Sequence, residues 1–178
     1  STEEIVIAVV RVLGSLPVLR WPLWGGLLAI LVDQSDLFMM NLLHLGGVGD
    51  YQSFDKYLDQ VYMLAFLAVA LRWRGREREV AVGLYAYRFV GFVAFELTAT
   101  RWVLLLFPNF FESWFMLTAA RHEFDLDRRF SKRGLMLLAG GLVAVKVFQE
   151  YAIHYARWLD GFTAVEAVKA VWAWLIPL

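Results

Sequence analysis

The sequence predicts an all-α protein, an integral membrane bundle of about six transmembrane helices that forms one domain over residues 1–178. Apolar residues make up 60% of the chain and aromatic residues 16%, whereas soluble domains are nearer half apolar. Apolar runs of helical length alternate with short links rich in glycine, proline or charge. Many of the eight tryptophans lie near the ends of these runs, as in the aromatic belts of membrane proteins.

Four helices are expected in the first 106 residues. The first is short and bends around Gly14 and Pro17, because proline interrupts helical hydrogen bonding. The second and third are joined by the tight link GGVGD and should therefore pack antiparallel, and the charged loop RWRGRERE separates the third from the fourth. The fourth should stop at Pro108 and Asn109. The expected ranges are residues 4–20, 21–45, 51–72 and 80–106.

Three further segments follow the proline stop. Residues 110–122 form an apolar segment that is short for a membrane span. The charged stretch EFDLDRRFSKRG is expected to be an exposed loop, and residues 134–157 form another helix, with paired glycines for close packing. Residues 163–177 are expected to form a last, short helix that is partly interfacial.

Charge and cysteine content exclude several function classes. The formal net charge is zero, so no nucleic-acid partner is indicated, and membrane lipids are the expected partners. We expect the chain in a bacterial inner membrane or an organelle membrane. The absence of cysteine excludes disulfides, thiol catalysis and cysteine-ligated metals.

Four aspartates on two neighbouring apolar helices are the strongest functional signal. Asp33 and Asp36 lie within a long apolar stretch, and Asp55 and Asp59 follow after the glycine link. A carboxylate in hydrocarbon costs roughly 3 kcal/mol, so its default interpretation is functional. Such a cluster cannot remain fully ionised without cations, and Mg or Mn, which take oxygen ligands, are the simplest partners.

Helical spacing allows the four carboxylates to meet. Asp33 and Asp36 fall within one arc of their helix, and Asp55 and Asp59 form one stripe of the next. Antiparallel helices joined by a tight link can turn these faces toward each other. The alternative is that Asp55 and Asp59 lie in a solvated interfacial turn beside Lys56.

The aspartate pairs carry a resemblance to a known family. The motif D-x-x-D-G-x-x-A-R, followed by G-x-x-x-D-x-x-x-D, is typical of CDP-alcohol phosphatidyltransferases, six-helix membrane enzymes. The sequence resembles this family over about residues 5–70: Asp33 and Asp36 match the first pair, and Asp55 and Asp59 match the second. The segment VVRVLGSLP is similar to the family's first helix.

The resemblance implies roles for individual residues. Asp59 would be the catalytic base that takes the proton from the attacking alcohol. Arg11 and Arg88 would bind substrate phosphate; alternatively, Arg11 reaches to the membrane interface and Arg88 pairs with Glu96 or an aspartate. The metal ligands implied are Asp33, Asp36, Asp55 and Asp59.

Departures from the motif leave other functions open. Leu37, Met40 and Asn41 stand where the family has glycine, alanine and arginine, and Tyr51 replaces the later glycine. The chain is therefore either a transferase of phospholipid head groups, with the family's donor or an altered one, or a non-catalytic membrane subunit of a larger complex that reuses the fold. A small ion or proton carrier is a third interpretation. The resemblance also favours a homodimer.

Basic residues predict the orientation of the helices. They gather in two loops, residues 72–78 and 121–133, which should lie on one side of the membrane. The positive-inside rule assigns that side to the cytoplasm and the aspartates to the opposite side. The family places its aspartates toward the cytoplasm, so the two expectations conflict.

Overall fold

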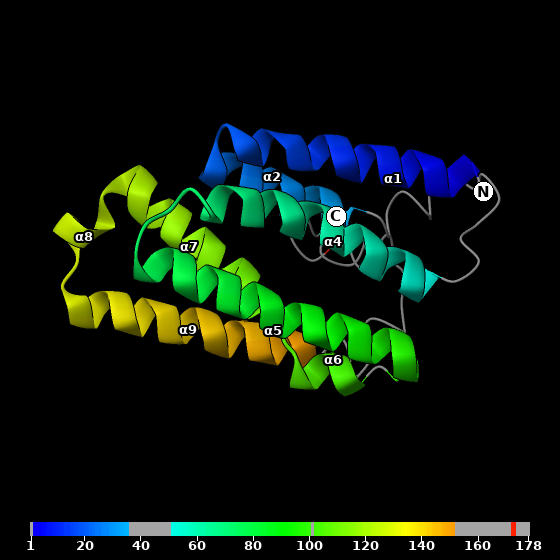
Figure 1. The fold of residues 1–178 in the computed structure, drawn as a ribbon. Coiled ribbons are helices and arrows are strands. Elements are labelled where there is room, and N and C mark those ends of the chain that lie inside the picture. The colour runs from blue at the N-terminus through cyan, green and yellow to red at the C-terminus, as the bar shows by residue number, and fades with distance from the viewer. Residues whose placement is uncertain (1, 36–50, 101, 152–171, 174–178) are drawn as a thin grey trace.

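A computed structural model of the chain describes residues 2–35, 51–100, 102–151 and 172–173. All regular secondary structure within these residues is helical, which confirms the all-α prediction (Figure 1). The elements are α1 (Thr2–Ser15), the 3-10 helix η1 (Leu16–Leu19), α2 (Pro22–Gln34), α4 (Tyr51–Ala70), α5 (Arg76–Thr98), α6 (Trp102–Leu106), α7 (Phe110–Phe124), α8 (Leu126–Arg129) and α9 (Lys132–Glu150).

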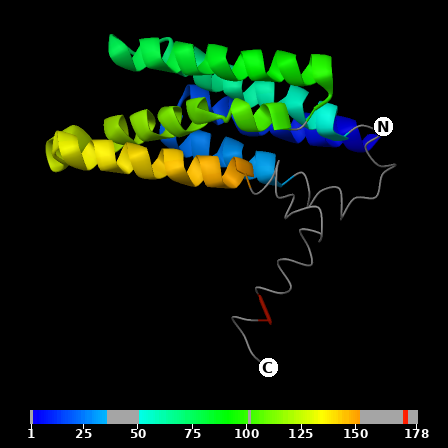
Figure 2. The same cartoon turned by 90° about the horizontal axis from the view of Figure 1, so that it is seen from below.

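The longer helices lie side by side along one direction. In Figure 1 the chain runs one way in α1, back in α2, and continues to reverse through α4, α5, α7 and α9. Figure 2, turned by 90°, gives the same arrangement of long axes. The antiparallel packing of the helices before and after the glycine link is therefore confirmed for α2 and α4.

A buried aromatic stack joins the middle helices. Phe66 of α4 stacks on Phe115 of α7 with ring centroids 4.0 Å apart, and Trp73 also stacks on Phe115, at 5.3 Å. Phe66 and Phe115 are fully buried. The stacked rings hold α4 and α7 at a fixed distance, because offset stacking stabilises the packing beyond what the burial of apolar area contributes.

The bend predicted around Gly14 and Pro17 is confirmed. The α-helix ends at Ser15, and residues 16–19 continue as the 3-10 turn η1. Gly25 on α2 packs directly against that turn: a Cβ atom there would lie 2.3 Å from the Val18 backbone nitrogen. Only glycine permits this approach, which brings α1 and α2 together.

The prediction of one helix over residues 80–106 is wrong. The helix ends at Thr98, because Ala99 adopts a left-handed conformation with φ +49°. The backbone N–H of Ala99 donates to the Phe95 carbonyl and caps the helix. Helix α6 then folds back against α5, where a Cβ on Gly91 would lie 2.2 Å from the Cβ of Phe107. The charged loop after α7 also contains a helical turn, α8.

One helix among the described residues, α5, is long and apolar enough to cross a membrane by length and composition. The expectation of about six spanning helices is therefore not supported by the described helices. In their described parts α1, α2 and α7 are shorter than a span. Helices α4 and α9 are long enough, but each carries several charged residues.

Parts of four expected helices lie outside the described residues. These are residues 36–45 of the second helix, residue 101 of the fourth, residues 152–157 of the sixth and most of residues 163–177. Trp172 and Ala173, within the last of these, are helical.

Gly25→Ala is expected to destabilise the fold by about 1–3 kcal/mol, because the added methyl group overlaps backbone atoms of η1. Thermal unfolding of the purified chain measures the change. The matched control is Gly83→Ala on α5, where nothing lies within 4 Å of the added atom and the helix should gain up to about 1 kcal/mol. Equal effects of the two substitutions would contradict the close approach at Gly25.

Candidate functional site

A stripe of residues spaced by four directs one face of α1 into the bundle. Glu3, Ile7, Arg11 and Ser15 are all buried, and residues at this spacing lie one above another on a helix. The Ser15 hydroxyl donates to the Arg11 carbonyl at 2.7 Å. Arg11 therefore points toward α2 and α4 rather than toward the outer surface.

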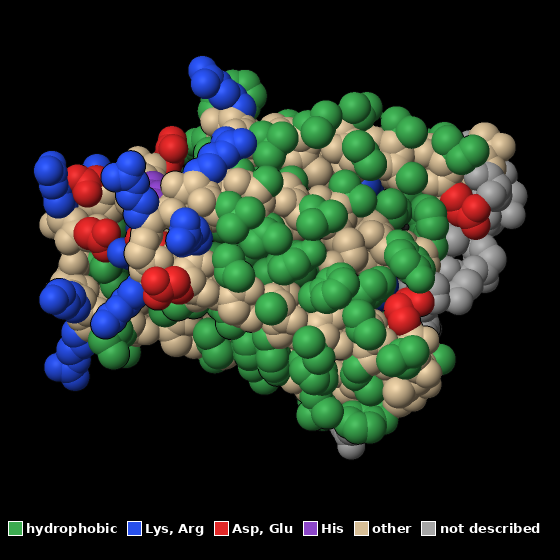
Figure 3. All heavy atoms as spheres, in the orientation of Figure 1, with side chains coloured by type: hydrophobic (Ala, Val, Ile, Leu, Met, Phe, Trp, Pro, Cys, Tyr) green, Lys and Arg blue, Asp and Glu red, His purple; other side chains and the backbone are tan. Residues whose placement is uncertain are grey.

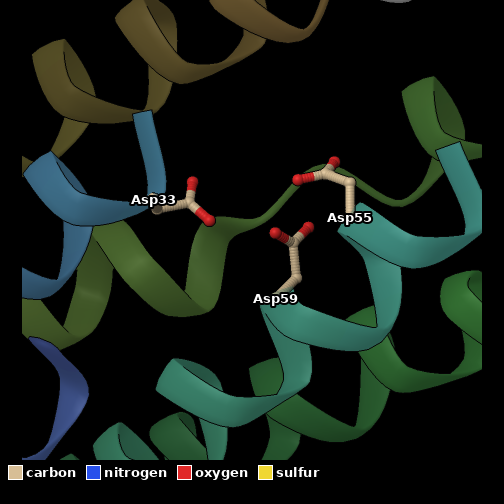
Figure 4. A group of neighbouring side chains, drawn as sticks. All are labelled: Asp33, Asp55 and Asp59. Carbon is tan, nitrogen blue, oxygen red and sulfur yellow. The ribbon is translucent and has the colours of Figure 1, made fainter. Parts of the chain in front are cut away.

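Two other helices supply the carboxylates. Asp33 lies in the last turn of α2, and Asp55 and Asp59 lie one turn apart near the start of α4. Figure 4 shows Asp33 facing the other two across the gap between the two helices. One carboxylate oxygen of each residue lies within 4.8 Å of the others, so the structure brings together both halves of the motif in this aspartate triad.

The guanidinium of Arg11 contacts all three members of the triad. Nη1 donates to Asp55 at 3.0 Å, and Nη2 donates to Asp59 at 2.9 Å and also to Asp33. The Arg11 side chain is 2% exposed. The alternative in which Arg11 reaches to the membrane interface is therefore wrong.

Lys56 completes the ion network. Its ammonium donates to Asp55 at 2.6 Å and to Asp59 at 3.1 Å. The side chains of Asp33, Asp55 and Asp59 are 15%, 20% and 10% exposed. Asp55 and Asp59 therefore lie largely buried on helix α4 and not in a solvated turn, although the Lys56 neighbour of that alternative is present. Three carboxylates against two cations leave a formal charge of −1, and the mutual pairing offsets much of the cost of burial.

The donor set fits a divalent cation. Carboxylate oxygens are the ligands that Mg²⁺ and Mn²⁺ prefer, and two ligands on opposite sides of a magnesium ion lie about 4.2 Å apart. The oxygens of the triad, which lie within 4.8 Å of one another, are close to that spacing. Arg11 and Lys56 compete with a metal for the same oxygens, so metal binding requires one of them to move aside.

Two further site residues were predicted, Asp36 and Arg88. Asp36 is outside the described residues. Arg88 is buried and donates to the Phe107 carbonyl at 2.6 Å, and within the described part of the chain it forms no ion pair. Glu96, its expected partner, accepts a hydrogen bond from Tyr57 at 3.0 Å instead.

Comparisons with protein-family models, curated proteins and solved structures found no match. The resemblance to CDP-alcohol phosphatidyltransferases therefore stays a prediction. It depends on the spacing of the aspartates and on the first-helix segment.

A second buried polar cluster lies between α4, α7 and α9, and we did not predict it from the sequence. Glu112 accepts hydrogen bonds from the Tyr62 hydroxyl at 2.9 Å and from Lys146 at 3.2 Å. The Asn109 amide donates to Glu112 at 3.3 Å and to the Tyr62 hydroxyl at 3.1 Å. The signal in the sequence was Asn109 before Glu112, a helix N-cap pattern whose side chain accepts from the Glu112 backbone N–H.

Arg11→Gln is expected to destabilise the fold by about 3–5 kcal/mol, because three buried carboxylates lose a shared cation. Denaturant unfolding measures the loss. Arg72→Gln is the control, since Arg72 is an exposed arginine that donates to the Leu19 carbonyl and should cost less than about 1.5 kcal/mol. Similar losses for both variants would contradict a central role for Arg11.

Lys146→Met is expected to destabilise the fold by about 1–3 kcal/mol, because the carboxylate of Glu112 keeps only neutral partners. Adding Glu112→Gln to Lys146→Met should recover part of that loss. A double-mutant cycle on unfolding free energies measures the coupling. Strict additivity of the two substitutions would contradict the ion pair.

Proposed function

We propose that this chain is an integral membrane protein that binds a divalent cation at its aspartate triad and transfers a phosphate-bearing lipid head group, as CDP-alcohol phosphatidyltransferases do. The observation that carries the proposal is the meeting of Asp33 from α2 with Asp55 and Asp59 from α4. These residues are three of the four aspartates that match the motif, and they come together inside an apolar helical bundle.

The outer faces of the bundle support membrane insertion. Exposed large apolar side chains cover much of the surface in Figure 3. On α1 they run from Ile5 to Leu13, on α5 from Val80 to Leu97 and on α9 from Met136 to Phe148. Soluble monomers rarely expose contiguous apolar surface on this scale. In a lipid environment these side chains do not contact water, so the free-energy cost of exposing them to water is removed. We include in the proposal that further helices besides α5 cross the membrane.

The chemistry assigns a task to each side chain. The acceptor hydroxyl oxygen forms a bond to the phosphorus of a diphosphate-linked lipid donor, and the bond from that phosphorus to the bridging oxygen breaks. Asp59 takes the hydroxyl proton, and Arg11, once released from the carboxylates, pairs with phosphate oxygens. A cation held by the triad would supply positive charge that stabilises the leaving phosphate.

A non-catalytic membrane subunit is the second candidate, and one observation favours it. Arg11 and Lys56 already contact the triad through five ion pairs. A network of this kind can hold α1, α2 and α4 together without a metal. The apolar outer faces would then be covered by lipid and by other subunits.

Titration calorimetry of the purified full chain with Mg²⁺ and Mn²⁺ tests the metal site. The wild-type chain is expected to bind, and Asp55→Asn and Asp59→Asn to bind at least about tenfold more weakly, since each loses an anionic ligand. Arg11→Gln is expected to bind more tightly than wild type, because the competing cation is gone. Asp127→Asn, an exposed acid outside the triad, is the matched control and should bind as wild type does.

Two results separate the candidates. No metal binding by wild type or by Arg11→Gln would overturn the transferase proposal and favour the structural subunit. If the chain binds both the metal and a CDP-linked lipid, the donor is the one that the family uses. If it binds the metal alone, the proposal requires a different diphosphate lipid as the donor.

A further inference from the structure

One end of the bundle gathers most of the basic side chains. The hairpin between α1 and α2, the loop before α5 and the region around α8 meet there, as the Arg72 bond to the Leu19 carbonyl and the 3.3 Å ion pair of Arg121 with Glu77 demonstrate. Figure 3 shows this end as a cluster of blue side chains beside the apolar surface. Its basic residues are Arg20, Arg72, Arg74, Arg76, Arg78, Arg121, Arg128, Arg129, Lys132 and Arg133.

This basic end has a large excess of positive charge. Its ten basic residues face five acidic ones, Glu77, Glu79, Glu123, Asp125 and Asp127, for a net charge of +5. Three acids are held by basic neighbours: Glu77 and Asp127 pair with Arg121, and Asp125 pairs with Arg128. Hydrogen bonds from Arg121 hold the pKa of Asp127 below its ordinary value.

The remaining cations have no ion-pair partner in the described part of the chain. They are exposed at the point where the apolar faces of α1, α5 and α9 end. A cluster of exposed cations at the border of an apolar surface matches the head-group region of a negatively charged bilayer. The residues are Arg20, Arg74, Arg76, Arg78, Arg129, Lys132 and Arg133.

We propose that the basic end is an interaction surface for anionic lipid head groups and that it directs the aspartate triad toward the opposite membrane face. The proposal depends on the membrane insertion proposed above. It follows the positive-inside rule rather than the family's orientation, so it goes with the altered donor of the proposed function, one that is present on the side away from the cytoplasm.

Helical rise sets the depth of the triad. Asp59 precedes Ala70, the last residue of α4, by eleven positions, and Asp55 by fifteen; these correspond to about 17 and 23 Å. With Ala70 taken as the edge of the hydrocarbon core, which is about 30 Å thick, both carboxylates lie beyond its midplane, in the half away from the basic end. A lipid donor would therefore reach the triad from the opposite leaflet.

Lipid selectivity tests the surface. The full chain in detergent is incubated with equal amounts of phosphatidylglycerol and phosphatidylcholine, and retained lipids are counted by native mass spectrometry. Wild type should retain phosphatidylglycerol preferentially. In the combined Arg74→Gln, Arg76→Gln and Arg78→Gln variant, the ratio of retained phosphatidylglycerol to phosphatidylcholine should fall more than about tenfold. The matched variant with lysine at the same three positions should keep the wild-type ratio.

If the glutamine variant keeps the wild-type preference for phosphatidylglycerol, the proposal that the basic end binds anionic lipid head groups is wrong. Tight binding of RNA homopolymers together with no preference for the anionic lipid would overturn it in favour of a nucleic-acid surface.

Cysteine labelling tests the orientation, and the chain offers a clean background because it contains no cysteine. Glu79→Cys and Thr98→Cys lie at exposed positions nineteen residues apart near the two ends of α5, about 29 Å of helix. In intact spheroplasts a membrane-impermeant maleimide should label Thr98→Cys, and it should label Glu79→Cys only after lysis.

The outcomes distinguish the two proposals. Labelling of Glu79→Cys alone before lysis would overturn the orientation and leave membrane insertion intact. Equal labelling of both variants before lysis, or recovery of the chain in the soluble fraction, would overturn the insertion on which the orientation depends.

Discussion

The guanidinium of Arg11 contacts carboxylates from two other helices, and the packing of α1 against α2 and α4 depends on this contact. Three aspartates cannot remain charged and close together inside an apolar bundle unless cations compensate them. Arg11 supplies one cation from α1, and Lys56 supplies another from α4. The same network that holds three helices together therefore also creates the strongest candidate site.

That dual role explains why two functions compete for one geometry. If a divalent cation binds, the triad exchanges a protein cation for a metal, and Arg11 becomes available for phosphate oxygens. If none binds, the network is a charged core that fixes the arrangement of the helices. The net charge of −1 on the described cluster favours attraction of a further cation, while the short contacts of Lys56 with Asp55 and Asp59 oppose its entry.

Charge is also separated along the bundle. Three aspartates outnumber two cations in the largely buried site near one end, and basic residues outnumber acidic ones at the other end. On the face drawn in Figure 3, the surface beside the basic end is mostly apolar. The prediction that the two basic loops share one side agrees with the ion pair between Glu77 and Arg121, which joins them. The second buried cluster, around Glu112 and Lys146, attaches α9 to α4 and α7 and gives the polar interior a second centre.

The sequence by itself determined the all-α class, the bend before Pro17 and the helical faces that carry the aspartates, because apolar periodicity, proline and i,i+3 or i,i+4 spacing act locally. It also identified Arg11 as a functional candidate, although only through a resemblance. Tertiary structure decided the rest. The end of α5 at Thr98 depends on the left-handed Ala99 and on the packing of Gly91 against Phe107, neither of which a local pattern encodes. The carboxylates that Arg11 contacts, the Phe107 carbonyl that Arg88 contacts and the Tyr62 and Lys146 groups that Glu112 contacts lie 19 to 50 positions away in the chain. Only the packed bundle therefore determines which of these groups meet.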